Sequence, residues 1–421
     1  MKHIYFLCSP NLGILDSWLP AIYKLRTDNK VILILPKEYL IQGFRRGNAL
    51  TRIAYKVFDD VIFPSSFGLF HQAKFNPKLI SRYSENKVKK AIYKYRIKLN
   101  NIFLLKPIKW ILDCFLFFYE RTYKDSFFNF KDPLPDNSLL LYDFSEENKK
   151  YVQSFIFLFR FSKKYSICHA IQLGTEAKYS LEIQNKPTVF AENALSAKNY
   201  SNYYNINREN IVVTGVLKYS DYWIKKIHKN SNLEEWDNFV LLISRPSSSY
   251  FPLHLKENYL QQIQDYIINK LGYKVIIKTH PKELLSFNSY YDTFDIENYG
   301  KSWKFSYEHP LSVGLNAKFA ISFYSSVVLD MSVIGIPCIE YLNYDFVSPD
   351  HDLNELKKYR NLGLSIGVNN QEEFFSSVNK IVKSKTRVLD DQLSSFDKLN
   401  LIDNKSITKI VEKINSDFNK T

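Results

Sequence analysis

Short apolar runs alternate with helical patterns along the start of the chain. The runs 3–9, 31–36 and 60–64 are rich in β-branched and aromatic residues, which is typical of strands. A helical pattern lies between the first two runs, with Ser17 as its expected cap and Pro20 in its first turn. Strands joined by helices of this length indicate βαβ units and a parallel sheet.

The same alternation returns later and predicts a second domain of the same kind. The polar stretch 196–210 interrupts it, so we expect a domain over 1–205, a second over 206–385 and C-terminal helices over 386–421. Two doubly wound α/β domains would point the carboxyl ends of their strands at a central crevice, where ligands bind. The later strands are predicted at 138–144, 165–173, 188–192, 210–215, 239–244, 274–280, 317–323 and 337–342.

The segment 70–130 breaks this rhythm because it is basic and apolar at once. Lysines at 87, 89, 90, 94 and 98 accompany apolar residues at helical spacing, and the apolar stretch 110–119 follows with Asp113 inside it. Such a segment suits an insertion that docks on an anionic membrane surface. It equally suits core helices with a lysine-rich outer face, and the pattern leaves both interpretations open.

Length and charge limit the class of protein. A chain of 421 residues, 45% of them hydrophobic, is long enough for two or three domains. The net charge of +14 suits nucleic acid, anionic lipid or phosphorylated small molecules, although lysine enrichment also fits a merely solubilising surface. Outside 85–130 no basic stripe is interleaved with aromatic residues, so we expect no nucleic-acid partner. The sequence predicts neither a signal peptide nor a membrane span, which favours a cytoplasmic protein, peripheral on the inner membrane face at most.

The cysteines and acidic residues predict no metal site. Cys8, Cys114, Cys168 and Cys338 form no CxxC pair, and three of them stand in strand-like apolar runs. We expect reduced core thiols and no zinc. The spaced aspartate pair at 350–352 falls in a loop rather than at a strand end, so we also expect no catalytic metal and no cofactor.

A histidine follows a buried run at the predicted carboxyl end of a strand. The run Lys274–Lys278 leads directly into Thr279, His280 and Pro281. In a doubly wound domain this end lines the ligand crevice. A neutral histidine there donates a hydrogen bond to a phosphate, a cationic one adds charge, and proline fixes the turn. The alternative is a plain surface histidine at a strand-to-loop turn.

Other predicted strand ends carry hydroxyl and cationic groups. Ser325 and Ser326 end one strand and open a helix, a position that suits a phosphate or a simple helix cap. Gly215 follows another strand and allows a ligand to approach the backbone closely. Arg245 follows a third, where it can clamp a diphosphate or a sugar carboxylate, or stand exposed in a loop.

The chain resembles bacterial surface-polysaccharide transferases of the GT-B fold in four stretches, which read in order NIVVTGVLKYSDYW, VLLISRPSS, VIIKTHPKE and FAISFYSSVVLDMSVIGIPCIEY. The His-Pro and later Ser-Ser motifs are shared with bacterial sialyltransferases, polysialyltransferases and capsular Kdo transferases. The CDP-glycerol glycerophosphotransferases of teichoic acid synthesis are similar in the same region. The resemblance covers about 138–345, best 208–345, and implies an N-terminal acceptor-binding and a C-terminal donor-binding domain. Nucleotide-sugar epimerases share this two-domain plan.

The resemblance assigns the donor phosphate to particular residues. In those families the histidine of the His-Pro motif and the serine pair hold the nucleotide phosphate, which carries over to His280, Pro281, Ser325 and Ser326. Glu340 matches an acidic residue that often meets the nucleotide ribose in GT-B enzymes. A structural pair within its buried strand is the other interpretation of this glutamate.

The catalytic base is where the resemblance breaks down. Sialyltransferases of this type carry an acidic-acidic-Gly motif late in the N-terminal domain, and the glycerophosphotransferases carry His-Gly-Thr. This chain has Gln172-Leu173-Gly174-Thr175-Glu176 instead. Glu176, His169 and Asp143 therefore remain three candidates for the base that an inverting transfer requires.

The resemblance implies an inverting glycosyltransferase of capsule or lipopolysaccharide synthesis. Its donor would be a nucleotide-activated sugar, with a CMP-activated acidic sugar of the sialic or Kdo kind favoured, and its acceptor a lipid-linked or free glycan. A CDP-polyol phosphotransferase and a UDP-sugar epimerase-like enzyme are the alternative enzymes. A nucleic-acid-binding or lipid-binding protein without catalytic activity is the alternative from a different class.

Overall fold

The computed structural model describes two compact units. The first comprises Met1–Lys218 and the returning segment Lys405–Thr421, and the second comprises Tyr219–Asn404. The described residues are 2–9, 12–37, 40, 43–44, 47–64, 70–75, 77, 126–128, 138–160, 162–168, 171, 173, 186–233, 236–280, 283, 288–347 and 351–419.

The first unit is built on a nine-stranded sheet in the order β5-β4-β3-β2-β1-β6-β7-β8-β9. The strands pair in parallel except where β4 meets β3 and β5, which are antiparallel pairs. All five residues of β6 are buried, as expected for a central parallel strand covered on both faces. The strands are β1 (Lys2–Leu7), β2 (Asn29–Ile34), β3 (Asp60–Pro64), β4 (Phe70–Lys74), β5 (Ser126–Phe128), β6 (Ser138–Tyr142), β7 (Lys163–Ile167), β8 (Thr188–Ala191) and β9 (Ile211–Val213).

The first helix starts earlier than its sequence pattern suggests. We expected Ser17 to cap it, but α1 begins at Gly13, so Pro20 lies in the helix interior. Proline there removes one backbone hydrogen bond, and the burial of the helix's apolar side chains offsets that loss. The other helices of this unit are α3 (Ala49–Val57), α7 (Lys150–Leu158), α8 (Ala194–Tyr203) and α17 (Ser406–Asn419), with short 3₁₀ turns at Phe144–Glu146 and Arg208–Asn210. A third 3₁₀ turn, Leu217–Tyr219, spans the division between the units.

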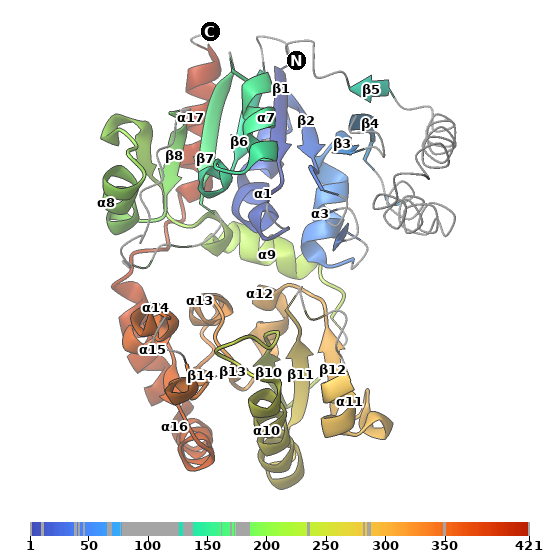
Figure 1. Ribbon diagram of the computed structural model, residues 1–421, viewed down its shortest axis with the longest axis vertical. Coiled ribbons are helices and arrows are strands. Elements are labelled where there is room, and N and C mark those ends of the chain that lie inside the picture. Colours follow the sequence, from blue (N-terminus) through green and yellow to red (C-terminus); the bar gives the residue numbers. More distant parts are fainter. Residues whose placement is uncertain are drawn as a thin grey trace, which may run out of the picture. The chain divides into compact units, whose positions relative to one another are not determined.

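The end of the chain returns to the first unit. Figure 1 shows α17, in red, against the first sheet. Lys2 Nζ donates to the Phe418 carbonyl at 2.6 Å, Tyr165 Oη donates to Asp417 Oδ2 at 2.9 Å, and Lys163 Nζ donates to the Asp417 carbonyl. These bonds join the last helix to β1 and β7, so the first unit is formed from both ends of the sequence.

The division between the units falls after residue 218 rather than near 205. The run at 210–215, which we expected in the second domain, supplies β9, and β9 pairs with β8 in the first sheet. The polar stretch 196–210 that suggested a linker instead includes most of α8, whose Asn193 cap accepts a hydrogen bond from Ser196 N–H at 2.8 Å.

The second unit contains a six-stranded parallel sheet in the order β12-β11-β10-β13-β14-β15. Figure 1 shows β14, β13, β10, β11 and β12 in this order across the unit. The chain runs outward from β10 through β11 to β12, then returns to the other side of β10 and runs from β13 to β15. The strand order therefore reverses between β10 and β13. The strands are β10 (Phe239–Ile243), β11 (Lys274–Lys278), β12 (Trp303–Ser306), β13 (Ala320–Ser322), β14 (Cys338–Tyr341) and β15 (Ile366–Val368).

Helices follow these strands in the usual manner of a doubly wound domain. The longest, α16, spans Gln371–Asp397, and a non-helical Ser384 marks a kink inside it. A π-helical turn, Gln264–Lys270, continues α10 (Leu253–Ile263). The remaining helical segments are α9 (Asp221–Lys229), α11 (Asn288–Phe294), Ile296–Asn298, α12 (Pro310–Val313), Gly314–Asn316, α13 (Val327–Val333), Tyr344–Phe346, α14 (Leu353–Leu356) and α15 (Lys358–Asn361).

Two sequence expectations concern cysteines and membrane spans. Cys8, Cys168 and Cys338 are buried and form no disulfide, whereas Cys114 lies outside the described residues. Among the helices of the described ranges, none is both long and apolar enough to cross a bilayer. Most of the basic segment 70–130 also lies outside the described residues, so its docking on a membrane stays a prediction.

Candidate functional site

His280 stands at the carboxyl end of β11, in a turn that is fixed through its backbone. Its N–H donates to Glu283 Oε2 at 2.6 Å, and its carbonyl accepts the N–H of Glu283 at 2.9 Å. Thr279 beside it is buried and His280 is half-buried. Pro281, the other half of the expected motif, lies outside the described residues. The side chain of Glu283 therefore holds this turn, and the part expected of Pro281 stays a prediction.

Glu283 is a fully buried carboxylate with a complete set of partners. Lys256 of α10 reaches its Oε1 at 2.5 Å, and the two side chains are 2% and 0% exposed. Ser244 Oγ, at the end of β10, donates to the same oxygen at 3.0 Å, and Tyr290 Oη of α11 donates at 2.7 Å. A buried carboxylate is tolerated only when a cation and hydrogen bonds compensate its lost hydration. Sequence reasoning missed this residue, although its position three residues after His280 was a signal.

The turn between β13 and α13 contains the serine pair. Ser325 is half-buried and its Oγ accepts the N–H of Val327 at 3.3 Å, so it serves as a local cap. Ser326 is exposed and its side chain makes no cap bond. The preceding residue, Tyr324, has a φ of +87°, which is unusual for any residue except glycine. Helix α13 has only seven residues, so the hydroxyls carry more weight here than the helix terminus.

Arg245 follows β10 and contacts the serine turn across the reversal point of the sheet. Its Nη1 donates to the Tyr324 carbonyl at 2.8 Å. The guanidinium carbon lies 4.6 Å from the ring centre of Tyr324 and 5.3 Å from that of Tyr250. Arg245 is therefore packed against the serine turn and is not the isolated loop arginine of the alternative interpretation.

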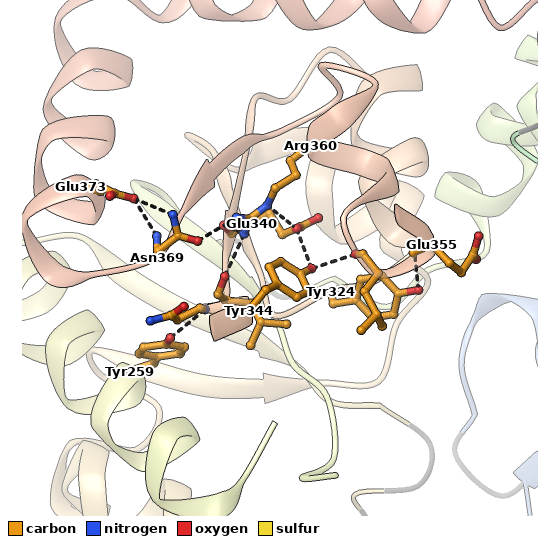
Figure 2. A network of polar contacts seen from close by, with 11 residues as sticks. Tyr259, Tyr324, Glu340, Tyr344, Glu355, Arg360, Asn369 and Glu373 are labelled. Carbon is orange, nitrogen blue, oxygen red and sulfur yellow. Dashed lines mark hydrogen bonds and ion pairs between the residues drawn. The ribbon is translucent and has the colours of Figure 1, made fainter. Parts of the chain in front are cut away.

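Glu340 of β14 forms the centre of a polar network in the second unit (Figure 2). Its Oε1 accepts hydrogen bonds from Tyr344 Oη and Arg360 Nε, both at 2.8 Å. Arg360 also donates to the carbonyls of Glu340 and Leu342 and to Asn369 Oδ1. Burial raises the pKa of Glu340, while Arg360 and Tyr344 oppose that rise.

The two carboxylate oxygens of Glu340 differ in their partners. Oε1 is bonded within the protein, which favours the structural pair over a ribose contact for that oxygen. Oε2 of Glu340 is buried and accepts no hydrogen bond from any residue that the structure describes. The expected ribose contact therefore stays a prediction that concerns Oε2.

The first unit contains one described candidate for the base and one donor-site candidate. Asp143 ends β6, is buried, and accepts hydrogen bonds from Ser145 N–H at 2.9 Å and Ser145 Oγ at 2.7 Å, which makes it the cap of a 3₁₀ turn. Gly215 has a φ of +83°, the conformation that glycine adopts without strain. It belongs to the first unit, whereas the other donor candidates belong to the second. His169 and Glu176 lie outside the described residues.

A buried acid that sequence reasoning missed follows β8. Glu192 is 4% exposed, and Tyr200 Oη donates to its Oε1 at 3.0 Å and its Oε2 at 2.7 Å. Burial raises the pKa of Glu192 to about 7; the hydrogen bonds of Tyr200 oppose this rise and the charge of Asp143 adds to it. Glu192 therefore changes protonation near neutral pH. Within the described ranges, no group of three His, Cys, Asp or Glu side chains could hold a metal ion.

Replacement of Glu283 by glutamine is expected to destabilise the protein by about 3–5 kcal/mol, because Lys256 is left as an unpaired buried charge. Lys256→Met in the same protein should recover part of that loss, since it removes the second charge. Urea denaturation of the single and double variants measures both effects. Lys74→Met is the control: this lysine is 76% exposed in its ion pair with Asp60, so its loss should cost at most about 1 kcal/mol. Equal costs for Glu283→Gln and Lys74→Met would contradict the assignment.

Glu192 should make the stability of the protein decrease as pH rises from about 4.5 to about 7. Over that range the unfolded chain releases a proton that the folded protein retains, because the folded pKa is the higher one. Glu192→Gln removes this loss. The free energy of unfolding of the variant minus that of the parent should therefore be about 2–3 kcal/mol larger at pH 8 than at pH 5. Denaturant titrations at both pH values measure it, with the exposed Glu209→Gln as control. Parallel pH profiles for parent and Glu192→Gln would refute the raised pKa.

Several solved structures have a similar fold. MnaA of S. aureus, solved with UDP, has 11% identity and a TM-score of 0.52, covering 100% of this chain and 97% of that chain. The UDP-GlcNAc 2-epimerase of Methanocaldococcus jannaschii has 13% identity and a TM-score of 0.50, with 99% and 100% covered. The wall teichoic acid polymerase TagF, solved with CDPG, has 11% identity and a TM-score of 0.51, with 100% and 89% covered.

At these identities the similarity concerns the fold alone. No protein-family model matches the sequence, and no curated protein matches it either. The predicted fold class is confirmed: the chain forms two Rossmann-type α/β domains, as in proteins of the GT-B kind.

Proposed function

We propose that the protein is an enzyme that uses a nucleotide-activated donor, bound at the carboxyl edge of the second sheet. The observation that carries the proposal is the position of three features at adjacent strand ends. His280 follows β11, Arg245 follows β10, and the Tyr324–Ser326 turn follows β13. The strand order reverses between β10 and β13, and ligands of doubly wound sheets bind outside the carboxyl ends at such a reversal.

The proposed donor site binds a phosphate through neutral and cationic donors. The His280 ring, with Thr279 and Pro281 shaping its turn, donates a hydrogen bond to a phosphate oxygen, and the hydroxyls of Ser325 and Ser326 bind the same group. These donors stabilise the charge that grows on the phosphate as it leaves. Likeness of fold to MnaA solved with UDP and to TagF solved with CDPG supports a nucleotide ligand.

The proposed reaction is an inverting glycosyl transfer. The acceptor hydroxyl oxygen forms a bond to the anomeric carbon of the sugar while the bond from that carbon to the phosphate oxygen breaks, and the nucleotide leaves with the electron pair. One base accepts the hydroxyl proton. Glu176 is our first candidate for this base, with His169 and Asp143 as the others.

The sequence resemblance specifies the proposal further. It favours a CMP-activated acidic sugar of the sialic or Kdo kind, transferred to a lipid-linked or free glycan of a capsule or lipopolysaccharide. The net charge of +14 suits an anionic donor. Likeness to TagF supports the first alternative, a CDP-polyol phosphotransferase, whose product is a phosphodiester instead of a glycoside. Likeness to the UDP-GlcNAc 2-epimerase of Methanocaldococcus jannaschii supports the second, an enzyme that acts on a UDP-sugar without an acceptor.

Nucleotide binding tests the proposal directly. CMP, CDP, UDP and GDP are each added to the parent protein, and the one that binds should raise the melting temperature by mass action. His280→Ala should bind that nucleotide about ten- to a hundredfold more weakly, because one hydrogen bond to a charged group is worth roughly 1.5–3 kcal/mol. His254→Ala, which removes an exposed histidine from α10, should bind it normally. Normal binding by folded His280→Ala would remove the main support for the proposed site.

Turnover of base variants identifies the proton acceptor. Glu176→Gln, His169→Ala and Asp143→Asn are compared with the parent in release of the nucleotide that binds best from sugar donors activated with it, with and without acceptor. Loss of a general base is expected to slow turnover by about 10²–10⁴-fold while donor affinity is retained. Near-normal turnover by folded Glu176→Gln would transfer the role to His169 or Asp143.

A further inference from the structure

Tyr324 has a backbone conformation that its own side chain disfavours. Its φ of +87° lies in the region that glycine occupies freely, where the Cβ of other residues is crowded by the backbone. Such a conformation persists only when the surroundings impose it. Tyr324 also immediately precedes Ser325 and Ser326, so its backbone angles set where these two hydroxyls point.

Arg245 holds Tyr324 at its backbone and at its ring. The Nη1–H bond of 2.8 Å fixes the carbonyl of Tyr324, and the guanidinium lies over the ring at 4.6 Å. A second ring, Tyr250, lies 5.3 Å from the same guanidinium and packs edge-on against Tyr324, with ring centres 6.2 Å apart. The arginine thus lies near two tyrosine rings while it binds the carbonyl.

The far end of the Tyr324 side chain is anchored as well. Figure 2 shows Tyr324 beside Glu355, whose carbonyl accepts the Tyr324 hydroxyl at 3.4 Å. The ring of Tyr359 packs against Tyr324 with centres 5.9 Å apart. These contacts fix the ring, but of the residues that the structure describes only Arg245 donates a side-chain hydrogen bond to the carbonyl that turns the chain into the serine pair.

We propose that Arg245 is a positioning residue, which holds the left-handed turn at Tyr324 and thereby aims Ser325 and Ser326 at the donor phosphate. The inference rests on the proposed function, since it assigns a role within the same donor site. It differs from a direct clamp on the phosphate, in which the charge of residue 245 acts on the ligand. A planar guanidinium can donate to the carbonyl and stack on the ring at the same time. A lysine ammonium keeps the charge but has no plane with which to stack.

A double-mutant cycle separates these two roles. Affinity for the nucleotide that the parent binds is measured by calorimetry for Arg245→Ala and Arg245→Lys, each alone and together with Tyr324→Gly. Both arginine variants should bind about tenfold more weakly or worse when Tyr324 is present. In proteins that carry Tyr324→Gly, replacing Arg245 should weaken nucleotide affinity by less than about twofold, because glycine adopts a positive φ without help. Arg160→Ala removes an equal charge, also stacked on a ring and bonded to a carbonyl, and should leave binding unchanged.

Hydrogen exchange provides a readout that needs no ligand. The amides of Val328 and Leu329 bond to the carbonyls of Ser325 and Ser326 at 3.2 and 3.0 Å. When Tyr324 is retained, Arg245→Ala should accelerate the exchange of these two amides. When Tyr324→Gly is present, adding Arg245→Ala should not accelerate it further.

The outcomes distinguish the inference from the function on which it rests. Full binding by Arg245→Lys, or an equal loss with and without Tyr324→Gly, makes Arg245 a direct charge contact and overturns the inference. Unchanged exchange in Arg245→Ala also overturns it. If the parent binds none of CMP, CDP, UDP and GDP, the proposed function fails, and the positioning role in binding fails with it. If the parent binds one of them and the Arg245 variants bind it equally well, only the role of Arg245 is refuted.

Discussion

The buried carboxylate of Glu283 is the constraint on which the organisation of the second sheet's edge depends. A charge removed from water must find its partners within the protein, and Glu283 takes them from four places: Lys256 on α10, Ser244 after β10, Tyr290 on α11 and the backbone of His280. Leaving any one of these groups unpaired in the core would itself cost free energy. The ends of β10 and β11 are therefore joined through a single side chain, and His280 is placed by it.

A second set of contacts links the end of β10 to the end of β13. Ser244, which binds Glu283, is followed by Arg245, and Arg245 binds the carbonyl of Tyr324 after β13. Contacts thus run without a gap from the His280 turn to the serine turn across three adjacent strands. Such a network gives loop residues fixed positions, which loops alone do not provide. The buried Glu340 and the half-buried Arg360 form a further ion pair one strand on, at β14.

The sequence predicted the strands that are buried and strongly apolar, and missed those that depend on distant partners. The runs that became β10, β11 and β14 are recognisable because burial on both faces demands continuous apolar residues. The strand Trp303–Ser306 carries alternating polar residues at the sheet edge and was not predicted. Among site residues, His280 and the serine pair were found from their positions after such runs. Glu283 and Glu192 were missed because their burial depends on Lys256 and Tyr200, whose proximity no local pattern reveals.

The choice of tyrosine at position 324 shows how strain and binding geometry are balanced in this edge. Glycine would adopt the positive φ without cost, yet it would remove the ring over which Arg245 lies and the hydroxyl that binds the Glu355 carbonyl. A glycine would also leave the serine turn more freedom before a ligand binds, and that freedom would be lost on binding. With tyrosine, the side chain's contacts hold the strained angle in the folded protein, so in the proposed donor site its cost would fall on folding instead of on ligand binding. The two tyrosine rings beside Arg245 fit the proposed positioning role, since a smaller side chain at 324 could not reach both the guanidinium and the Glu355 carbonyl.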